Sequence, residues 1–87
     1  MNIQISPNWK IRSDSLNIML VETLNGHEFI RGFFATLQGL FQSLANIQIK
    51  RSTATTLQQL RDDLKMLRTR LNTLLQPYNL AVVEVSK

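Results

Sequence analysis

The sequence of 87 residues contains no cysteine and a single histidine, His27. Without thiolates the chain can form neither disulfide bonds nor cysteine-ligated metal sites, and one imidazole leaves little for a zinc site or a Ser-His triad. His27 adjoins Glu28, but neighbours on a strand point to opposite faces, which is poor geometry for an acid–base pair. We therefore predict no catalytic residue, no cofactor and no metal, and we expect that the protein is not an enzyme.

Long apolar runs are also missing. A helix needs about 20 apolar residues to span a bilayer, and every apolar run in the sequence is much shorter. The opening MNIQISPNWK lacks the basic segment followed by an apolar one that marks a secretion signal. Together with the absence of cysteine, this predicts a cytoplasmic protein without membrane contact. The composition, 44% apolar and 18% charged, is typical of a globular domain. So short a chain predicts one domain over residues 1–87, with a thin core that a second subunit can reinforce.

Residues 1–34 have the alternating pattern of a β-meander. Apolar and polar residues alternate over residues 2–5 and again over residues 8–12, with Pro7 between the two runs. Residues 16–24, LNIMLVETL, carry apolar side chains on both faces. This last segment is therefore predicted to be the central strand of the sheet.

Two turn sequences flank the predicted central strand, one before it and one after it. Ser13-Asp14-Ser15 predicts the first turn, because short polar side chains bond nearby backbone groups. Asn25-Gly26 predicts the second, a type I′ hairpin turn, because both residues tolerate positive φ. A strand over residues 27–33 should follow, with Phe29, Arg31 and Phe33 on one face and Ile30 on the other.

The period changes to that of helices after Thr36, which is the expected N-cap of a first helix over residues 36–50. Its predicted buried positions are Leu37, Leu40, Phe41, Leu44 and either Ile47 or Gln48. A second helix is predicted over residues 56–76, from the hydroxyl-rich segment STATT to Pro77. Residues 79–86 are rich in β-branched side chains and predict a C-terminal strand. The expected fold class is α+β, an antiparallel meander of three to four strands packed against two helices, with a C-terminal β-rich tail.

Leucines recur in strict three-then-four steps along the second predicted helix, at Leu57, Leu60, Leu64, Leu67, Leu71 and Leu74. Exposure of all six would leave an apolar patch that few soluble monomers carry. One interpretation is an internal core seam, and the other is a helix pair between two subunits of a homodimer. The stripe covers fewer than about three heptads, so its period cannot separate the two.

The net charge of +4 permits nucleic acid or an acidic protein as a partner. The candidate contact residues lie just before or on the second predicted helix, and they are Lys50, Arg51, Arg61, Lys65 and Arg68. Arg61, Lys65 and Arg68 share one ridge of that helix. Lys10, Arg12 and Arg31 could extend a basic surface onto the sheet. The alternative is a solvated face, which the interruption by Asp62 and Asp63 favours.

Residues 6–22, SPNWKIRSDSLNIMLVE, resemble the start of small uncharacterised proteins encoded by bacteriophages and prophages. The matching positions form the pattern NW-x-I-x-SDS-x-NI, carried here by Asn8-Trp9, Ile11, Ser13-Asp14-Ser15 and Asn17-Ile18. The resemblance implies an N-terminal β-hairpin followed by a strand and helices. It also implies a phage accessory protein without known catalytic residues, acting in the cytoplasm of the host cell.

Three functions follow as hypotheses. The first is a non-catalytic interaction module, forming a homodimer and binding or inhibiting a host protein through the leucine-bearing helix. The second is a small basic regulator that binds nucleic acid. The third is a structural or assembly component of a virion.

Overall fold

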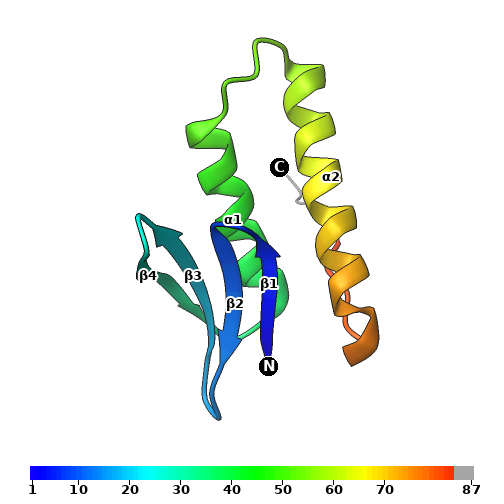
Figure 1. Cartoon of the computed structure of the whole chain (residues 1–87). Helices are drawn as coiled ribbons and strands as arrows, with labels where there is room; N and C mark the ends of the chain where they lie inside the picture. Colours follow the sequence, from blue (N-terminus) through cyan, green and yellow to red (C-terminus); the bar gives the residue numbers. More distant parts are fainter. Residues whose placement is uncertain (84–87) are drawn as a thin grey trace. The chain divides into compact units, whose positions relative to one another are not determined.

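The computed structural model describes residues 1–83, in which a four-stranded antiparallel sheet precedes two α-helices (Figure 1). The α+β fold class and the meander are therefore confirmed. The elements, in chain order, are β1 (Asn2–Ser6), β2 (Trp9–Ser13), β3 (Ile18–Leu24), β4 (His27–Phe34), α1 (Leu37–Arg51), α2 (Leu57–Leu75) and the 3-10 helix η1 (Gln76–Tyr78).

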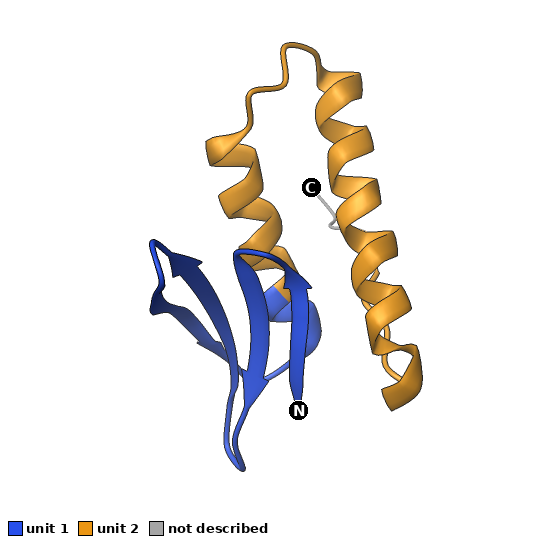
Figure 2. Cartoon of the chain, in the orientation of Figure 1, with its two compact units in different colours: residues 1–40 blue, residues 41–87 orange. Residues whose placement is uncertain are grey.

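The chain divides into two compact units, residues 1–40 and residues 41–87 (Figure 2). The first unit holds the sheet and the first turn of α1, and the second holds the rest of α1 and all that follows. The expectation of a single domain over residues 1–87 stays a prediction.

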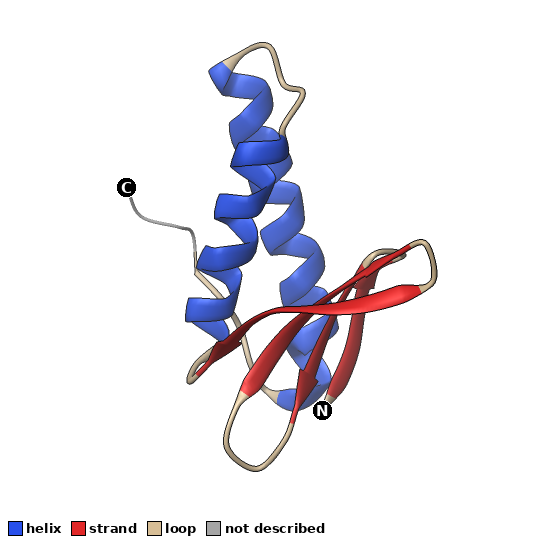
Figure 3. Cartoon of the chain, turned by 90° about the vertical axis from the view of Figure 1, so that its left-hand side faces the viewer, coloured by secondary structure: helices blue, strands red, loops and turns tan. Residues whose placement is uncertain are grey.

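The sheet is a simple meander in which each strand pairs with the next, in the order β1-β2-β3-β4 (Figure 3). Four consecutive residues of β3, from Met19 to Glu22, are buried. Burial on both faces explains why residues 16–24 do not alternate cleanly between apolar and polar side chains. β3 is an interior strand, as predicted.

The turn at Asp14 is formed by its own carboxylate. Oδ1 of Asp14 accepts hydrogen bonds from the backbone N–H groups of Leu16 and Asn17, both at 2.8 Å. These bonds keep Leu16 in the turn, where it is 84% exposed, and β3 begins only at Ile18. The predicted start of the strand at residue 16 was therefore wrong.

The hairpin between β3 and β4 has the predicted two-residue turn. Leu24 pairs with His27, and the turn residues between them have φ of 52° at Asn25 and 80° at Gly26. Positive φ at both positions is the requirement of a type I′ turn, and glycine meets it at the second position without steric cost.

A β-bulge in β4 changes which side chains share a face. Leu20 pairs with Gly32 but Val21 pairs with Ile30, so Arg31 is an extra residue on β4. Paired residues of an antiparallel ladder lie on the same face, so Phe33 joins Ile30 on the face that carries Met19 and Val21. The prediction that Phe33 shares a face with Phe29 was wrong, because strict alternation does not hold across a bulge.

The helices begin at the predicted caps. Thr36 Oγ1 accepts from the Gly39 N–H at 3.1 Å, and Thr56 Oγ1 accepts from the Gln59 N–H at 3.1 Å. The predicted stripe of α1, Leu37, Leu40, Phe41 and Leu44, is buried, with Ala45 in addition. α2 ends at Leu75, and Pro77 lies in η1 directly after it.

The C-terminal segment does not form the predicted strand in residues 80–83, and residues 84–86 of that prediction lie outside the described part of the chain. The Asn72 side chain of α2 takes the place of a neighbouring strand. Its Oδ1 accepts from the Val82 N–H at 2.7 Å, and its Nδ2 donates to the Val82 carbonyl at 3.0 Å. Val82 is buried and its backbone is satisfied without a sheet.

Candidate functional site

The leucine stripe of α2 is covered at one end and open at the other. Leu71, like the neighbouring Leu75, is fully buried. Leu60, Leu64, Leu67 and Leu74 are half-buried, and Leu57 is 55% exposed. Leu71 is thus a core residue and presents no surface to another molecule, which corrects its place among the interface candidates. The other positions of the stripe keep exposed apolar surface.

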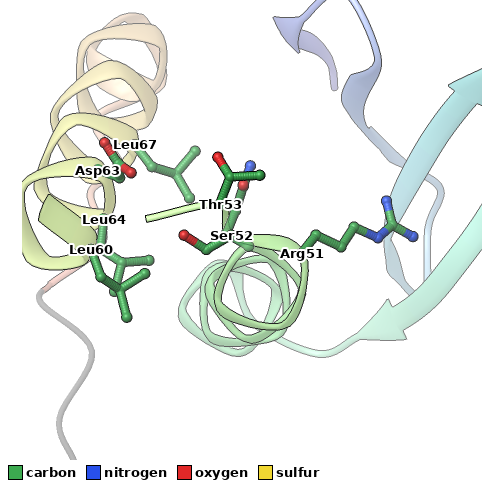
Figure 4. Close-up of a pocket in the computed structure, with 8 residues that line it drawn as sticks. Arg51, Ser52, Thr53, Leu60, Asp63, Leu64 and Leu67 are labelled. Carbon is green, nitrogen blue, oxygen red and sulfur yellow. The ribbon is translucent and has the colours of Figure 1, made fainter. Parts of the chain in front are cut away.

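Three of the half-buried leucines line a pocket of about 240 Å³ within residues 41–87 (Figure 4). Its polar wall comes from the last turns of α1, the following loop and one residue of α2, namely Gln48, Arg51, Ser52, Thr53 and Asp63. We call this pocket, with Leu60, Leu64 and Leu67 as its apolar side, the hairpin groove. It joins a wall of aliphatic side chains to a rim of hydroxyl and charged groups.

The loop that closes one end of the groove is held by short polar side chains. Ser52 Oγ accepts from the Ala54 N–H at 3.0 Å, and Gln59 Oε1 accepts from the Thr55 N–H at 3.2 Å. With the Thr56 cap, these bonds satisfy backbone donors around the first turn of α2. The hydroxyl-rich sequence STATT therefore positions the helix that carries the leucines.

The excess of positive charge lies in the part of the sequence that follows the sheet, residues 41–83. Residues 41–83 contain six Lys and Arg but two Asp, whereas residues 1–40 contain three of each sign. The predicted contact residues Lys50, Arg51, Arg61 and Lys65 are exposed and Arg68 is half-buried. Asp62 accepts a hydrogen bond from the Gln58 side chain at 3.0 Å on the same helix.

The three basic residues of the sheet are in ion pairs. Glu28 pairs with both Lys10 and Arg12, and the hydrogen bonds from those two side chains hold its pKa below the ordinary value. Arg31 Nε donates to Glu22 Oε1 at 2.9 Å. Two carboxylates thus offset two of these three positive charges, which argues against the expected basic surface on the sheet.

The described residues offer no arrangement for metal chemistry. Among residues 1–83, no group of three or more His, Cys, Asp and Glu side chains is placed to hold a metal ion. In the same part of the chain, no helix combines the length and the hydropathy that crossing a bilayer requires.

Trp9, 8% exposed, belongs to the core of the sheet.

One surface was missed by the sequence interpretation. β4 exposes Phe29, Ile30 and Phe33 at 43%, 50% and 60%. We refer to these residues as the β4 patch. The sequence signal was the near absence of polar residues from FIRGFF, since a half-buried strand normally alternates.

No family model matches the chain, and neither a curated protein nor a solved structure is detectably similar to it.

Proposed function

We propose that the protein is a non-catalytic interaction module that holds an apolar segment of a partner protein in the hairpin groove. The observation that carries the proposal is that Leu60, Leu64 and Leu67 are only partly buried around a pocket, although the same stripe is fully buried at Leu71. An apolar wall with a polar rim is the anatomy of protein interfaces.

The groove, about 240 Å³, has room for aliphatic side chains inserted by a helix or a short extended segment of the partner, but not for the helix itself. Helix-in-groove complexes use anchors at helical spacing, which the three leucines provide on this side. Full burial of one leucine side chain stabilises a complex by about 1.5–3 kcal/mol, and each 1.4 kcal/mol is about tenfold in affinity. Arg51 and Asp63 supply one charge of each sign for orienting the partner.

The resemblance of residues 6–22 to phage and prophage proteins supports a specific setting. In this proposal the protein is a phage accessory factor in the host cytoplasm, and the partner in the groove is a host protein that it binds or inhibits. No observation on residues 1–83 favours the virion-component hypothesis, which stays a prediction.

A site-specific cross-linking experiment tests the groove. A photoreactive residue at position 60 should capture one protein in host cells, whereas the same residue at position 66 should not, because Met66 is 70% exposed on the same helix and does not line the groove. In the reconstituted complex, Leu60→Gln should weaken binding at least about tenfold, with Met66→Gln as the matched control. Equal capture from both positions, or an unchanged affinity of the Leu60→Gln variant, would reject the proposal.

A nucleic-acid-binding regulator is the second candidate, and the segregation of charge supports it. The excess of four positive charges lies within residues 41–83, and the cations of the sheet are already paired. Such a concentration attracts phosphates at low salt.

Fluorescence anisotropy with duplex DNA and with RNA, at several salt concentrations, tests the second candidate. Replacement of Arg61, Lys65 and Arg68 by Gln should flatten the dependence of log Kd on log salt by about one unit for each phosphate that the variant no longer neutralises. The control variant, Lys10→Gln with Arg12→Gln, should bind as the wild type does. Absence of binding at low salt would exclude this function.

A further inference from the structure

β4 is the edge strand at one end of the sheet. It is eight residues long and pairs with β3 on one side, and within residues 1–83 no other strand pairs with its second side. An edge strand presents a row of backbone donors and acceptors to any strand that approaches. β4 contains neither proline nor lysine, which are two of the devices that protect edges, although the β-bulge at Arg31 is a third.

The apolar side chains of β4 lie on both faces of the sheet. The register places Ile30 and Phe33 with Val21 and Met19 on one face, and it places Phe29 with Glu22 on the other. A helix or a loop lying on one face would leave the other face open. A strand added to the edge contacts side chains of both faces at once, so the geometry selects a strand as the occupant.

The charges of β4 are satisfied before any partner arrives. Glu28 is held by Lys10 and Arg12, and Arg31 pairs with Glu22 and lies over the Phe29 ring, 5.1 Å from its centroid. Residues 1–40 carry three charges of each sign. Two such units approach without net repulsion, whereas two copies of the helical segment, with the whole excess of positive charge, repel each other.

We propose that the occupant is a second copy of the chain, with β4 of each copy antiparallel to the other across a two-fold axis. The chain itself contains a strand with the required properties, since β4 is long, apolar on both faces and neutralised. An isologous pair buries the β4 patch of both copies and joins two four-stranded sheets into one of eight strands.

The exposed surface limits the size of the interface in this dimer. A phenylalanine has about 150–250 Å² to bury, so the half-exposed patch of two copies, with the strand edges, amounts to on the order of 1,000 Å² in total. This is the lower limit for a specific interface, and for such a small interface we expect a dissociation constant in the micromolar range. The proposal does not depend on the hairpin groove.

Sedimentation equilibrium of the full chain over about 1–300 μM tests the proposal. The wild type should shift from monomer to dimer with concentration. Ile30→Lys with Phe33→Lys should weaken dimerisation at least about tenfold, because lysine on an edge strand opposes pairing. The control Leu16→Lys places one lysine on an 84% exposed leucine of the same unit and should leave the dimer intact.

Circular dichroism establishes that each variant is folded, and Phe33→Ser, at the most exposed position of the patch, replaces the double variant if that one unfolds. Hydrogen exchange should show β4 amides gaining protection as the protein concentration rises. A wild type that is monomeric throughout the range overturns the proposal. So does a dimer that the β4 variants leave unchanged and Leu60→Gln dissociates, which would assign the interface to the leucine stripe.

Discussion

Glu22 is a charged side chain in the core of the sheet, 3% exposed, opposite Trp9 in the register. Burial of a carboxylate is costly unless a cation and hydrogen bonds compensate it. Arg31 supplies the cation from the neighbouring strand, and the β-bulge at Arg31 gives that residue a position outside the regular alternation. The extra residue of the bulge is thus the one that pairs with the buried acid.

We expect Arg31→Gln to lower the free energy of unfolding by about 2–3 kcal/mol, somewhat less than for fully buried pairs, because the Arg31 side chain is one-third exposed. The double variant Glu22→Gln with Arg31→Gln should lose less than the sum of the two single variants. Urea unfolding followed by circular dichroism measures both effects. The control Arg12→Gln, in an exposed ion pair, should cost under about 1 kcal/mol. An unchanged urea midpoint for Arg31→Gln would contradict this account.

Among the elements, the start of α2 determines the hairpin groove. The leucines of the groove lie in the first three turns of the helix, directly after the loop that forms part of its rim. The Thr56 hydroxyl and the Gln59 side chain hold that start through two hydrogen bonds. Fraying of this turn would open the groove before it affected the buried end of the stripe at Leu71 and Leu75.

Thr56→Ala should therefore lower the free energy of unfolding by about 1 kcal/mol, the usual effect of losing an N-cap. Hydrogen exchange should show faster exchange of the Gln59 and Leu60 amides, which bond to the Thr56 hydroxyl and carbonyl. Thr55→Ala is the matched control, because Thr55 contributes its backbone N–H to Gln59. Equal exchange rates in the two variants would show that the cap does not hold the first turn.

Across the chain as a whole, net charge differs between the two segments. The first 40 residues have equal numbers of both signs and an apolar edge, which suits self-association. Residues 41–83 carry the positive excess and the groove, which suits a partner of another kind. The carboxylates of the first segment balance its positive charges, so its net charge and its stability depend on whether these groups are ionised.

Thermal stability of the whole chain should fall in acid for this reason. Backbone N–H groups of Leu16 and Asn17 hold the pKa of Asp14 below its ordinary value, and Lys10 and Arg12 do the same for Glu28. A carboxylate with a lowered pKa stabilises the folded state above its unfolded pKa, and this contribution disappears as the pH falls through the folded value. Tm should thus be flat above about pH 5 and decline below about pH 4.

The matched variant for this titration is Asp14→Asn, which keeps an oxygen that can accept the two N–H bonds but cannot titrate. Its Tm should decline less between about pH 5 and pH 3 than that of the wild type. Parallel curves for the two proteins would show that Asp14 does not contribute to acid sensitivity.

Features that depend on neighbours along the chain were predictable from the amino-acid order. They include the type I′ turn at Asn25-Gly26, the threonine caps, the α1 stripe and the end of α2 before Pro77, because φ preferences and local hydrogen bonds act over a few residues. Of the candidate site, the leucine stripe was predictable from its spacing.

Features that depend on register, or on residues far apart in the chain, became visible only in the folded molecule. The bulge that moves Phe33 to the face of Ile30, the pairing of the sheet cations and the Asn72 side chain that satisfies Val82 all join segments with no local signal for one another. The burial of the α2 stripe, complete at Leu71 and partial at Leu60, was also visible only in the folded molecule. Periodicity shows which side chains share a helix face, but burial depends on what the rest of the chain places over that face.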